Sequence, residues 1–541
     1  MAKVIFKSYK ENDSLLLPPS LGDLVPPTHP ARIVSSVIDH LDISSIESKY
    51  KGGGTSSYNP RMLIKVLVYA YMCNTFSGRK IERQLKENVI YMWLSGYSTP
   101  DFRTLNLFRS QRLNGDFEGI FTQVVELIHR EGLVTLDVQY IDGTKIESVA
   151  NKYTFVWKGT VDTYDERLKT KVDTVLRQAE RVISSEEEDL AGTTAGMNPE
   201  DFQRRVDNIM EKIESIPSLM QKEIRKAKEE SLPKMREYEH HREILQGRGS
   251  YSKTDTDATF MRMKEDYMGN GQLKPGYNVQ ISTENQYITN YGIYQKPGDT
   301  TTLIDYLMSF ERKYHRQSKE VVADSGYGSE ENYCYLLDNA IVPYVKNNYF
   351  HMDIRKERKR PSDSYTLPSP YYNSDDDYFV CPMGQHMTYI GDRLRKSETG
   401  HVGECRRYMA RDCSRCLIKG VCTKAKGNRI YEVNLNLMKQ KRLVRELLTS
   451  ERGLEHRSKR PIEPEAVFGQ IKYDSGFKRF SLKSLPKVSV EFGLIALAHN
   501  LRKYASTIPS RNNKNPQNPL IKRNSNINRC IFLCFEKIQV A

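Results

Sequence analysis

The sequence predicts an α/β protein, in which a mixed sheet is combined with a helical N-terminal part and with insertions. A strand-like apolar run occurs at 133–142, residues 276–295 alternate like a hairpin with ENQ near its turn, and 318–346 is expected to form a strand, a helix and a second strand. Amphipathic helices lie between these segments. Two of the expected strands end on a single acid that is soon followed by glycine, Asp142 in YIDG and Asp324 in VVADSG. Open α/β sheets carry their chemistry at the carboxyl ends of strands, so both acids are site candidates. The alternative for Asp142 is a strand-ending residue that hydrogen-bonds its own turn.

The charge of the chain indicates the kind of partner that it binds. The 541 residues include 82 Lys and Arg against 68 Asp and Glu, a net charge of +14. Such a surplus favours a polyanion, usually nucleic acid, although a merely soluble basic protein is the alternative. No apolar run approaches the roughly 18 residues of a membrane helix, and the polar start does not resemble a signal peptide. We therefore expect a cytoplasmic, nucleoid-associated protein with no membrane partner.

The first 130 residues are expected to be helical. After Pro60, the stretch YNPRMLIKVLVYAYM keeps a 3.6-residue apolar period. Ser77 is the expected cap of the basic helix GRKIERQLKEN, and Asp101 that of FRTLNLFRSQRL. A helix, a short turn and a basic helix suit a DNA groove, although two packed helices often look the same. The residues expected to contact DNA here are Arg79, Lys80, Arg83, Arg103 and Arg109.

The rest of the chain divides by its patterns. A polar helical stretch at 161–250 resembles a helical hairpin inserted into a sheet protein. The expected divisions are an N-terminal domain for DNA binding or assembly (1–130), a first core part (131–160), the helical insertion (161–250), a second core part (251–350), a basic linker with a Cys-rich module (351–430), C-terminal core helices (431–506) and a disordered tail (507–541).

Five of the nine cysteines lie within residues 381–422, namely Cys381, Cys405, Cys413, Cys416 and Cys422. In a reducing compartment this clustering indicates a metal and not disulfides. Cys413 and Cys416 have the spacing of two ligands on one Zn²⁺, and three other cysteines compete for the remaining two places. His386 or His401 could substitute. Unligated, reduced cysteines are the alternative to a structural zinc module.

A third acid, Glu465, lies in EAVFGQIK on an expected helix, where Glu465 and Lys472 share a face. Carboxylates from two strand ends and a helix are the oxygen ligands that a pair of Mg²⁺ ions needs for phosphodiester chemistry. Basic residues nearby suit a phosphate backbone: Arg457, Lys459, Arg460, Lys478 and Arg479.

With these motifs in hand, the chain resembles the bacterial insertion-sequence transposases of the DDE class. The matching stretches are YNPRMLIKVLVYAY, GRKIERQLKENVIYMWLSG and PDFRTLNLFR near the start, YIDGTKIESVANKYTFVWK and VVADSGYG at the first two acids, and RPIEPEAVFGQIK, GFKRF and AHNLRK near the end. The resemblance implies an RNase-H-like core that is interrupted by insertions. It also implies that Asp142, Asp324 and Glu465 form a metal-binding triad.

The family places a Tyr-Arg-Glu-Lys pattern around the Glu, and this sequence keeps only part of it. Lys472 stands seven residues after Glu465, as the pattern requires. Pro461 occupies the position of the Arg, with Arg460 one residue away, and no Tyr stands at the matching place. Glu463 is the rival of Glu465 for the role of third acid.

The function that the resemblance implies is cut-and-paste transposition. The protein would cleave DNA at the inverted-repeat ends of the element and join them to target DNA, with Mg²⁺ or Mn²⁺ as cofactor and with Lys472 acting in catalysis. It would act as a homodimer or higher oligomer on DNA. The alternatives are a DNA-binding regulator that has lost catalysis and a metal-dependent nuclease without strand transfer.

Overall fold

The computed structural model describes residues 20–50, 57–183, 198–263, 271–351, 370–397 and 399–514, with side chains to residue 507. The basic linker expected after residue 351 lies largely outside the described residues, as does most of the expected tail. The chain forms two compact units. One holds the N-terminal 135 residues together with 474–476 and the chain from Ser489 onward, and the other holds 136–473 and 477–488.

The first unit is helical, as expected. Pro60 begins helix α4 (Pro60–Met72), and the Asn59 side chain caps it by accepting from the amides of Arg61 and Met62. Asp101 caps α7 by accepting from the Thr104 amide, which confirms its expected role, whereas the Ser77 side chain makes no capping bond. The remaining helices of this part are α1 (Leu21–Leu24), α2 (Pro30–Asp39), α3 (Ser44–Glu47), α5 (Gly78–Glu87), α6 (Val89–Ser95), α7 (Phe102–Leu107), the π-helical turn Phe108–Arg112 and α8 (Phe117–Arg130).

The second unit is built on a mixed six-stranded sheet, which confirms the α/β class. Its order is β4-β5-β1-β7-β8, with β6 also paired to β5. Strand β1 pairs antiparallel with β5 and parallel with β7, and β7 pairs parallel with β8. The strands are β1 (Val138–Glu147), β4 (Thr259–Arg262), β5 (Leu273–Glu284), β6 (Tyr287–Tyr294), β7 (Glu320–Ala323) and β8 (Val342–Val345). This arrangement is consistent with the expected RNase-H-like core.

Helices pack against this sheet through one apolar core. Buried Val321 and Val345 of the strands meet Leu307 of α13, Tyr333 of α14 and Leu448 of α17. The helices are α13 (Leu303–Tyr314), α14 (Glu330–Asp338), α17 (Leu435–Thr449) and α18 (Glu451–Lys459), followed by the 3₁₀ turn Arg460–Ile462, α19 (Pro464–Gly469) and the π-helical turn Gln470–Asp474. The core therefore fixes the strands and the C-terminal helices that carry the three candidate acids.

Strand β1 corrects one expectation from the sequence. The predicted strand ended at Asp142 with a turn at Gly143, but β1 runs on to Glu147 because β5 pairs with it along that whole length. The parallel ladder with β7 does end early, at Tyr140 opposite Val322. Asp142 thus lies just beyond the parallel ladder but inside the antiparallel one.

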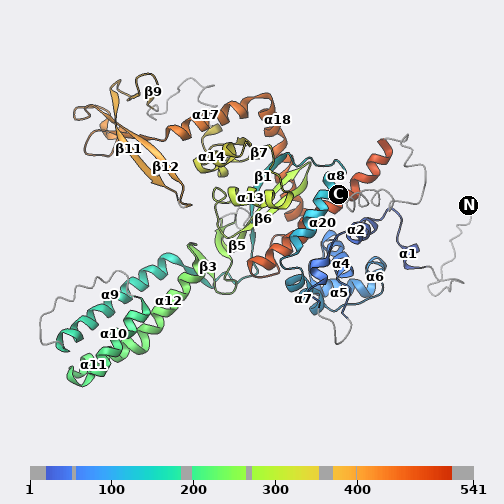
Figure 1. Cartoon of the computed structure of the whole chain (residues 1–541), viewed down its shortest axis with the longest axis horizontal. Helices are drawn as coiled ribbons and strands as arrows, with labels where there is room; N and C mark the ends of the chain where they lie inside the picture. Colours follow the sequence, from blue (N-terminus) through green and yellow to red (C-terminus); the bar gives the residue numbers. More distant parts are fainter. Residues whose placement is uncertain are drawn as a thin grey trace, which may run out of the picture. The chain divides into compact units, whose positions relative to one another are not determined.

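The helical insertion forms a bundle of its own, in which α9 (Lys158–Ile183), α10 (Pro199–Glu211), α11 (Ser218–Lys226) and α12 (Leu232–Leu245) lie alongside one another (Figure 1). Its core includes Leu176, Phe202 and Ile224. A two-stranded sheet of β2 (Phe155–Trp157) and β3 (Ser250–Ser252) joins the bundle to the core sheet. The expected helical hairpin is therefore a bundle with more than two helices.

The Cys-rich part contains a five-stranded antiparallel sheet in the order β13-β12-β11-β10-β9, which the sequence did not predict. The strands are β9 (Tyr371–Asn373), β10 (Tyr378–Val380), β11 (His386–Lys396), β12 (Val402–Ala410) and β13 (Ile430–Val433), and the short helix α16 (Lys419–Cys422) precedes β13. The long helix α20 (Leu485–Lys514) continues seven residues past the expected start of the tail. No helix in the described part of the chain is long and apolar enough to span a membrane.

Candidate functional site

The three acids singled out from the sequence meet around one side chain, Arg460. Its Nη2 lies 3.2 Å from Asp142 Oδ1 and 3.7 Å from Asp324 Oδ2, and its Nη1 donates to Glu465 Oε1 at 2.5 Å. Only 10% of the Arg460 side chain is exposed, against 36% for Asp324 and 46% for Glu465. Three carboxylates from β1, the end of β7 and α19 therefore share one buried guanidinium.

Each acid is held in place by its own element. Asp324 follows the last residue of β7, and its Oδ1 accepts from the Gly326 amide at 2.8 Å, which caps the 3₁₀ turn Ser325–Tyr327. Asp142 is carried by β1 between the β5 and β7 ladders. Glu465 stands in the first turn of the short helix α19, which begins at Pro464.

The rival acid, Glu463, points elsewhere. It is buried, and its Oε2 accepts from the Gln286 amide in the β5–β6 turn at 2.9 Å. Burial raises the pKa of the Glu463 carboxyl. The structure thus brings Glu465, and not Glu463, to Asp142 and Asp324.

A fourth acid, Asp299, lies beside this group, and no motif in the sequence singles it out. Its Oδ1 accepts from Asn278 Nδ2 at 2.7 Å and from Gln280 Nε2 at 2.8 Å, both on β5. A Cβ atom on Gly143 would lie 2.2 Å from Gln280 Nε2 and 2.7 Å from Asp299 Oδ1. Gly143 therefore makes room for this side-chain network, and it lies inside β1 and not at a turn.

Tyr327 is fully buried close to Asp299, Asp142 and Asp324. Its hydroxyl donates to Gln280 Oε1. Burial raises the pKa of Tyr327, and the negative charges of Asp299, Asp142 and Asp324 raise it further. The phenol thus stays protonated and keeps Gln280 oriented so that the Gln280 amide can donate to Asp299.

A second cation, Lys346, follows β8 and is only partly exposed. Burial lowers its pKa, the charges of Arg460 and Arg457 lower it further, and Asp324 and Glu465 oppose the change. Sequence reasoning missed Lys346 because it lies in no motif, and only the fold brings it near the acids.

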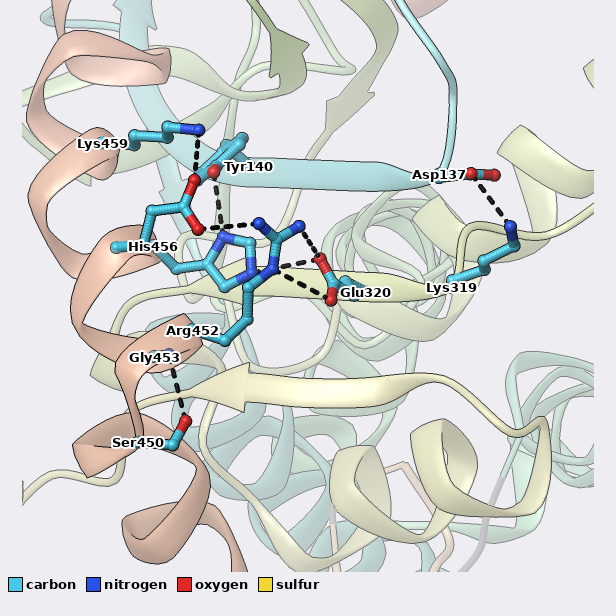
Figure 2. A network of polar contacts seen from close by, with 10 residues as sticks. Asp137, Tyr140, Lys319, Glu320, Ser450, Arg452, Gly453, His456 and Lys459 are labelled. Atoms are coloured by element: carbon cyan, nitrogen blue, oxygen red, sulfur yellow. Dashed lines mark hydrogen bonds and ion pairs between the residues drawn. The ribbon is translucent and has the colours of Figure 1, made fainter.

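The helix that leads to Arg460 is fastened to both acid-bearing strands through His456, as Figure 2 shows. His456 Nδ1 lies 2.9 Å from the Tyr140 hydroxyl on β1. Its Nε2 lies 3.1 Å from Glu320 Oε2 on β7, at an angle that is poor for a hydrogen bond. Arg452 also pairs with Glu320, at 2.8 Å. His456 is buried, and this burial lowers the pKa of its imidazole, although Glu320 opposes the change.

The donor chemistry of the three acids suits a hard divalent cation, since all the ligands would be carboxylate oxygens. Within the described residues, however, no three His, Cys, Asp or Glu side chains already form a metal-binding group. The suitable donor set and the lack of a preformed group agree if Arg460 occupies the place where a cation would bind. Its guanidinium lies between the three carboxylates and spaces them apart. A bound cation would therefore have to displace Arg460.

Comparison with protein families now adds to this geometry. Residues 19–111 match the model of a transposase domain (DUF772), and residues 380–505 match the model of a transposase DDE domain. Both matches support a DDE transposase of the insertion-sequence type. A search of curated proteins found no match. The second matched range includes Glu465 and strands β11 to β13 but neither Asp142 nor Asp324.

Within the described residues, the five clustered cysteines do not form a group of three or more possible metal ligands. Cys381, Cys405, Cys413, Cys416 and Cys422 are free thiols, and Cys381 packs against the apolar core that contains Cys413. That core belongs to the β9–β13 sheet, and Cys405 is buried on β12 opposite Arg393. Cys422 Sγ accepts from Arg429 at 2.7 Å. The structure describes no preformed zinc site in this region, and zinc binding stays a prediction.

The basic residues predicted to contact DNA fall into two groups. Arg109 is buried, where it donates to the Tyr71 hydroxyl at 2.7 Å, and this interior position is unsuited to a DNA contact. Arg479 donates to two backbone carbonyls of the core, and Arg457 packs over Phe350. The exposed residues are Arg79, Lys80, Arg83, Arg103, Lys478 and Arg479.

Proposed function

We propose that this transposase cleaves DNA strands at the ends of an insertion sequence and joins them to target DNA, with a divalent cation held by Asp142, Asp324 and Glu465. The convergence of these three carboxylates on Arg460 is the observation that carries the proposal. Mg²⁺ or Mn²⁺ bound there would polarise the scissile phosphate and activate the attacking oxygen. The transposase would act in the cytoplasm, on the nucleoid, as a dimer or larger assembly on DNA.

The residues of the chain divide the remaining work. Hydrogen bonds link Tyr327, Gln280 and Asp299 and fix these side chains next to Asp142. The carboxylates therefore need little reorganisation. Arg460, once displaced from the acids, would offer its planar fork to a phosphate oxygen. Lys346 would add positive charge at the same place, since its charge already acts on Asp324 and Glu465.

We further propose that the N-terminal helices recognise the ends of the element. Arg79 and Arg103 lie over the same ring, that of Phe102, at 4.8 and 5.8 Å, which brings the basic faces of α5 and α7 together. Lys80 and Arg83 extend the exposed basic face of α5. Such a cluster suits the phosphates that flank a DNA groove.

The decisive experiment mixes the purified transposase with linear DNA that carries the flanking inverted repeats, in Mg²⁺ or Mn²⁺. We expect cleavage at the repeat ends and transfer of the 3′-hydroxyl ends into a second DNA. Binding without cleavage in either metal would instead support a regulator that has lost catalysis. Cleavage without joined products would support a nuclease.

A further inference from the structure

A wide cavity of about 1210 Å³ lies in the second unit, next to the loop that carries Asp299. Its walls come from separate parts of the chain. They are the base of the helical insertion at Lys158 and Gly247–Gly249, the loop Lys296–Thr301, the N-terminus of α14, and the end of the β11–β12 hairpin.

Both insertions are tied to the core where they line this cavity. At the insertion base, the Lys158 amide donates to Gly249 O at 3.0 Å, and Gln295 Nε2 donates to Asp257 O at 3.0 Å. At the N-cap of α17, which follows β13, Asn434 Nδ2 donates to Glu330 Oε2 on α14 at 2.6 Å. A Cβ atom on Gly403 would lie 2.6 Å from the same oxygen, so the hairpin backbone approaches α14 closely. These bonds define the cavity as a part of the fold.

The acidic and basic side chains that line the cavity differ in their interaction partners. The described lining includes five Lys or Arg and three Glu residues. Each of the three carboxylates has partners: Glu330 accepts from Asn434 and Asn436, Glu331 accepts from Thr399, and Glu432 pairs with Arg393 and Arg395.

The lysines of the lining differ from these acids. Lys158, Lys296 and Lys396 are exposed, and their ammonium groups make no hydrogen bond or ion pair with any residue that the structure describes. The cavity therefore presents three available positive charges on three different walls, while each of its carboxylates already has a hydrogen-bond or ion-pair partner.

A short chain of contacts connects this cavity to the candidate acids. Thr300 lines the cavity, and its hydroxyl donates to Gly326 O at 2.6 Å. The Gly326 amide in turn donates to Asp324 Oδ1 at 2.8 Å. A strand whose scissile phosphate lay at Asp324 could therefore continue past Thr300 into the cavity.

We propose that this cavity binds the sugar–phosphate backbone of the DNA next to the cleaved or joined phosphate, through Lys158, Lys296 and Lys396. Its volume exceeds the roughly 300–1,000 Å³ of small-molecule pockets. Three lysines on separate walls suit a row of phosphates better than one small anion. The inference rests on the proposed function, since it takes the DNA to be the substrate of the nearby acids.

The test compares DNA binding by the full chain and by the triple variant Lys158→Ala, Lys296→Ala, Lys396→Ala. The matched control replaces three exposed lysines that do not line the cavity, Lys212, Lys222 and Lys439, by alanine. The probes are a labelled duplex with a terminal repeat and its flank, the same duplex without the flank, and an unrelated duplex. Affinity is measured by fluorescence anisotropy over a range of salt concentrations, with Asp324→Ala present throughout to prevent cleavage.

Each phosphate contact contributes about 0.9 to the slope of log affinity against log salt. We expect the cavity variant to reduce this slope by roughly 2 to 3 relative to the control variant. A loss confined to the flanked duplex would assign the cavity to flanking DNA, and a loss on the unrelated duplex would assign it to target DNA. Equal slopes for cavity and control variants on all probes would overturn the proposal. Failure of the proposed function is distinguishable, because it would leave wild-type protein without cleavage whatever the slope.

Discussion

Arg460 and Glu465 stand five residues apart across a 3₁₀ turn, and the guanidinium of the first donates to the carboxylate of the second at 2.5 Å. The same guanidinium lies within 3.7 Å of Asp142 and Asp324. One cationic side chain thus pairs with acids that come from three distant parts of the sequence. A divalent cation bound as we propose would need the same oxygens, so it would compete with Arg460 for one place.

This competition gives a first prediction. Arg460→Ala leaves three neighbouring carboxylates without their shared cation, so the variant should lose about 1 to 2 kcal/mol of stability in EDTA. Added Mg²⁺ should then raise the melting temperature of the variant more than that of the wild type. The control is Arg442→Ala, which removes an arginine that is paired only on the exposed surface of α17. An equal Mg²⁺ effect in wild type and Arg460→Ala would show that Arg460 does not occupy the cation site.

The second prediction separates the acids. Asp142→Ala, Asp324→Ala and Glu465→Ala should each reduce strand cleavage to below a few per cent of wild type, with DNA binding nearly unchanged, because affinity comes from many phosphate contacts. Glu463→Gln keeps an oxygen for the Gln286 amide and should retain cleavage. Cleavage by Glu465→Ala together with inactivity of Glu463→Gln would reverse the assignment of the third acid.

The third prediction concerns Asp299, which accepts two amide hydrogen bonds next to the triad. Asp299→Ala leaves the amides of Asn278 and Gln280 without this acceptor, and it should cost about 1–3 kcal/mol of stability. Asp299→Asn can still offer an oxygen, so it should keep its stability and most of its single-turnover cleavage rate. If Asp299→Asn folds normally but is as inactive as Asp142→Ala, Asp299 acts as a ligand and not as a support.

The fourth prediction concerns Lys472, which is buried in the π-helical turn that follows α19. Its ammonium cannot coordinate a metal, but it can pair with a phosphate near the acids. Lys472→Met keeps the aliphatic volume and removes the charge, and it should slow cleavage or joining by about one to two orders of magnitude at unchanged Mg²⁺ dependence. Lys472→Arg should recover only a part of the rate. Wild-type rates in Lys472→Met across Mg²⁺ concentrations would assign the lysine to packing alone.

The fifth prediction follows from His456, whose pKa is lowered from 6.5 by burial. Because the pKa is lowered in the folded state, His456 binds a proton more tightly in the unfolded chain than in the folded one. The stabilisation by neutral His456 is therefore complete above pH 6.5 and is lost as the pH falls through the folded-state value. His456→Phe should unfold with a weaker pH dependence than wild type between about pH 7 and pH 5. The control is His240→Phe, which replaces an exposed histidine of α12. If the stability of wild type and of His456→Phe depended on pH to the same extent, folding would not change the pKa of His456.

Local sequence patterns were sufficient to predict several elements of the structure. The Asn285–Gln286 turn between β5 and β6 follows from ENQ between alternating runs, and both residues take a positive φ angle. Asp324 at the end of β7 is equally local, because a short apolar run stops at an acid and a glycine. The meeting of Asp142, Asp324 and Glu465 was expected only from the resemblance to transposases, since no local pattern brings residues so distant in sequence together.

What the sequence missed depends on pairing at long range. Gly143 resembled a turn residue, but β5 pairs with it and fills the space above it with Gln280. Asp299 lies in KPGDTT, whose residues are typical of a turn. Nothing in that stretch indicates that the Asp299 carboxylate accepts hydrogen bonds from two side-chain amides on β5. Strand β11 is mostly exposed, so it lacks the alternation by which strands are recognised. Arg109 looked like a surface cation because the pattern alone did not tell which side of its helix is buried.

The pairing of β2 with β3 has a consequence for how this protein is put together. The chain leaves the core at Trp157 and returns at Ser250, and these two residues are partners in one antiparallel ladder. The whole bundle between them thus occupies the position of a hairpin loop. A tight turn such as Asn-Gly could close the same ladder. The bundle is therefore a removable module, and relatives could gain, lose or exchange it without a change in the order of the core strands.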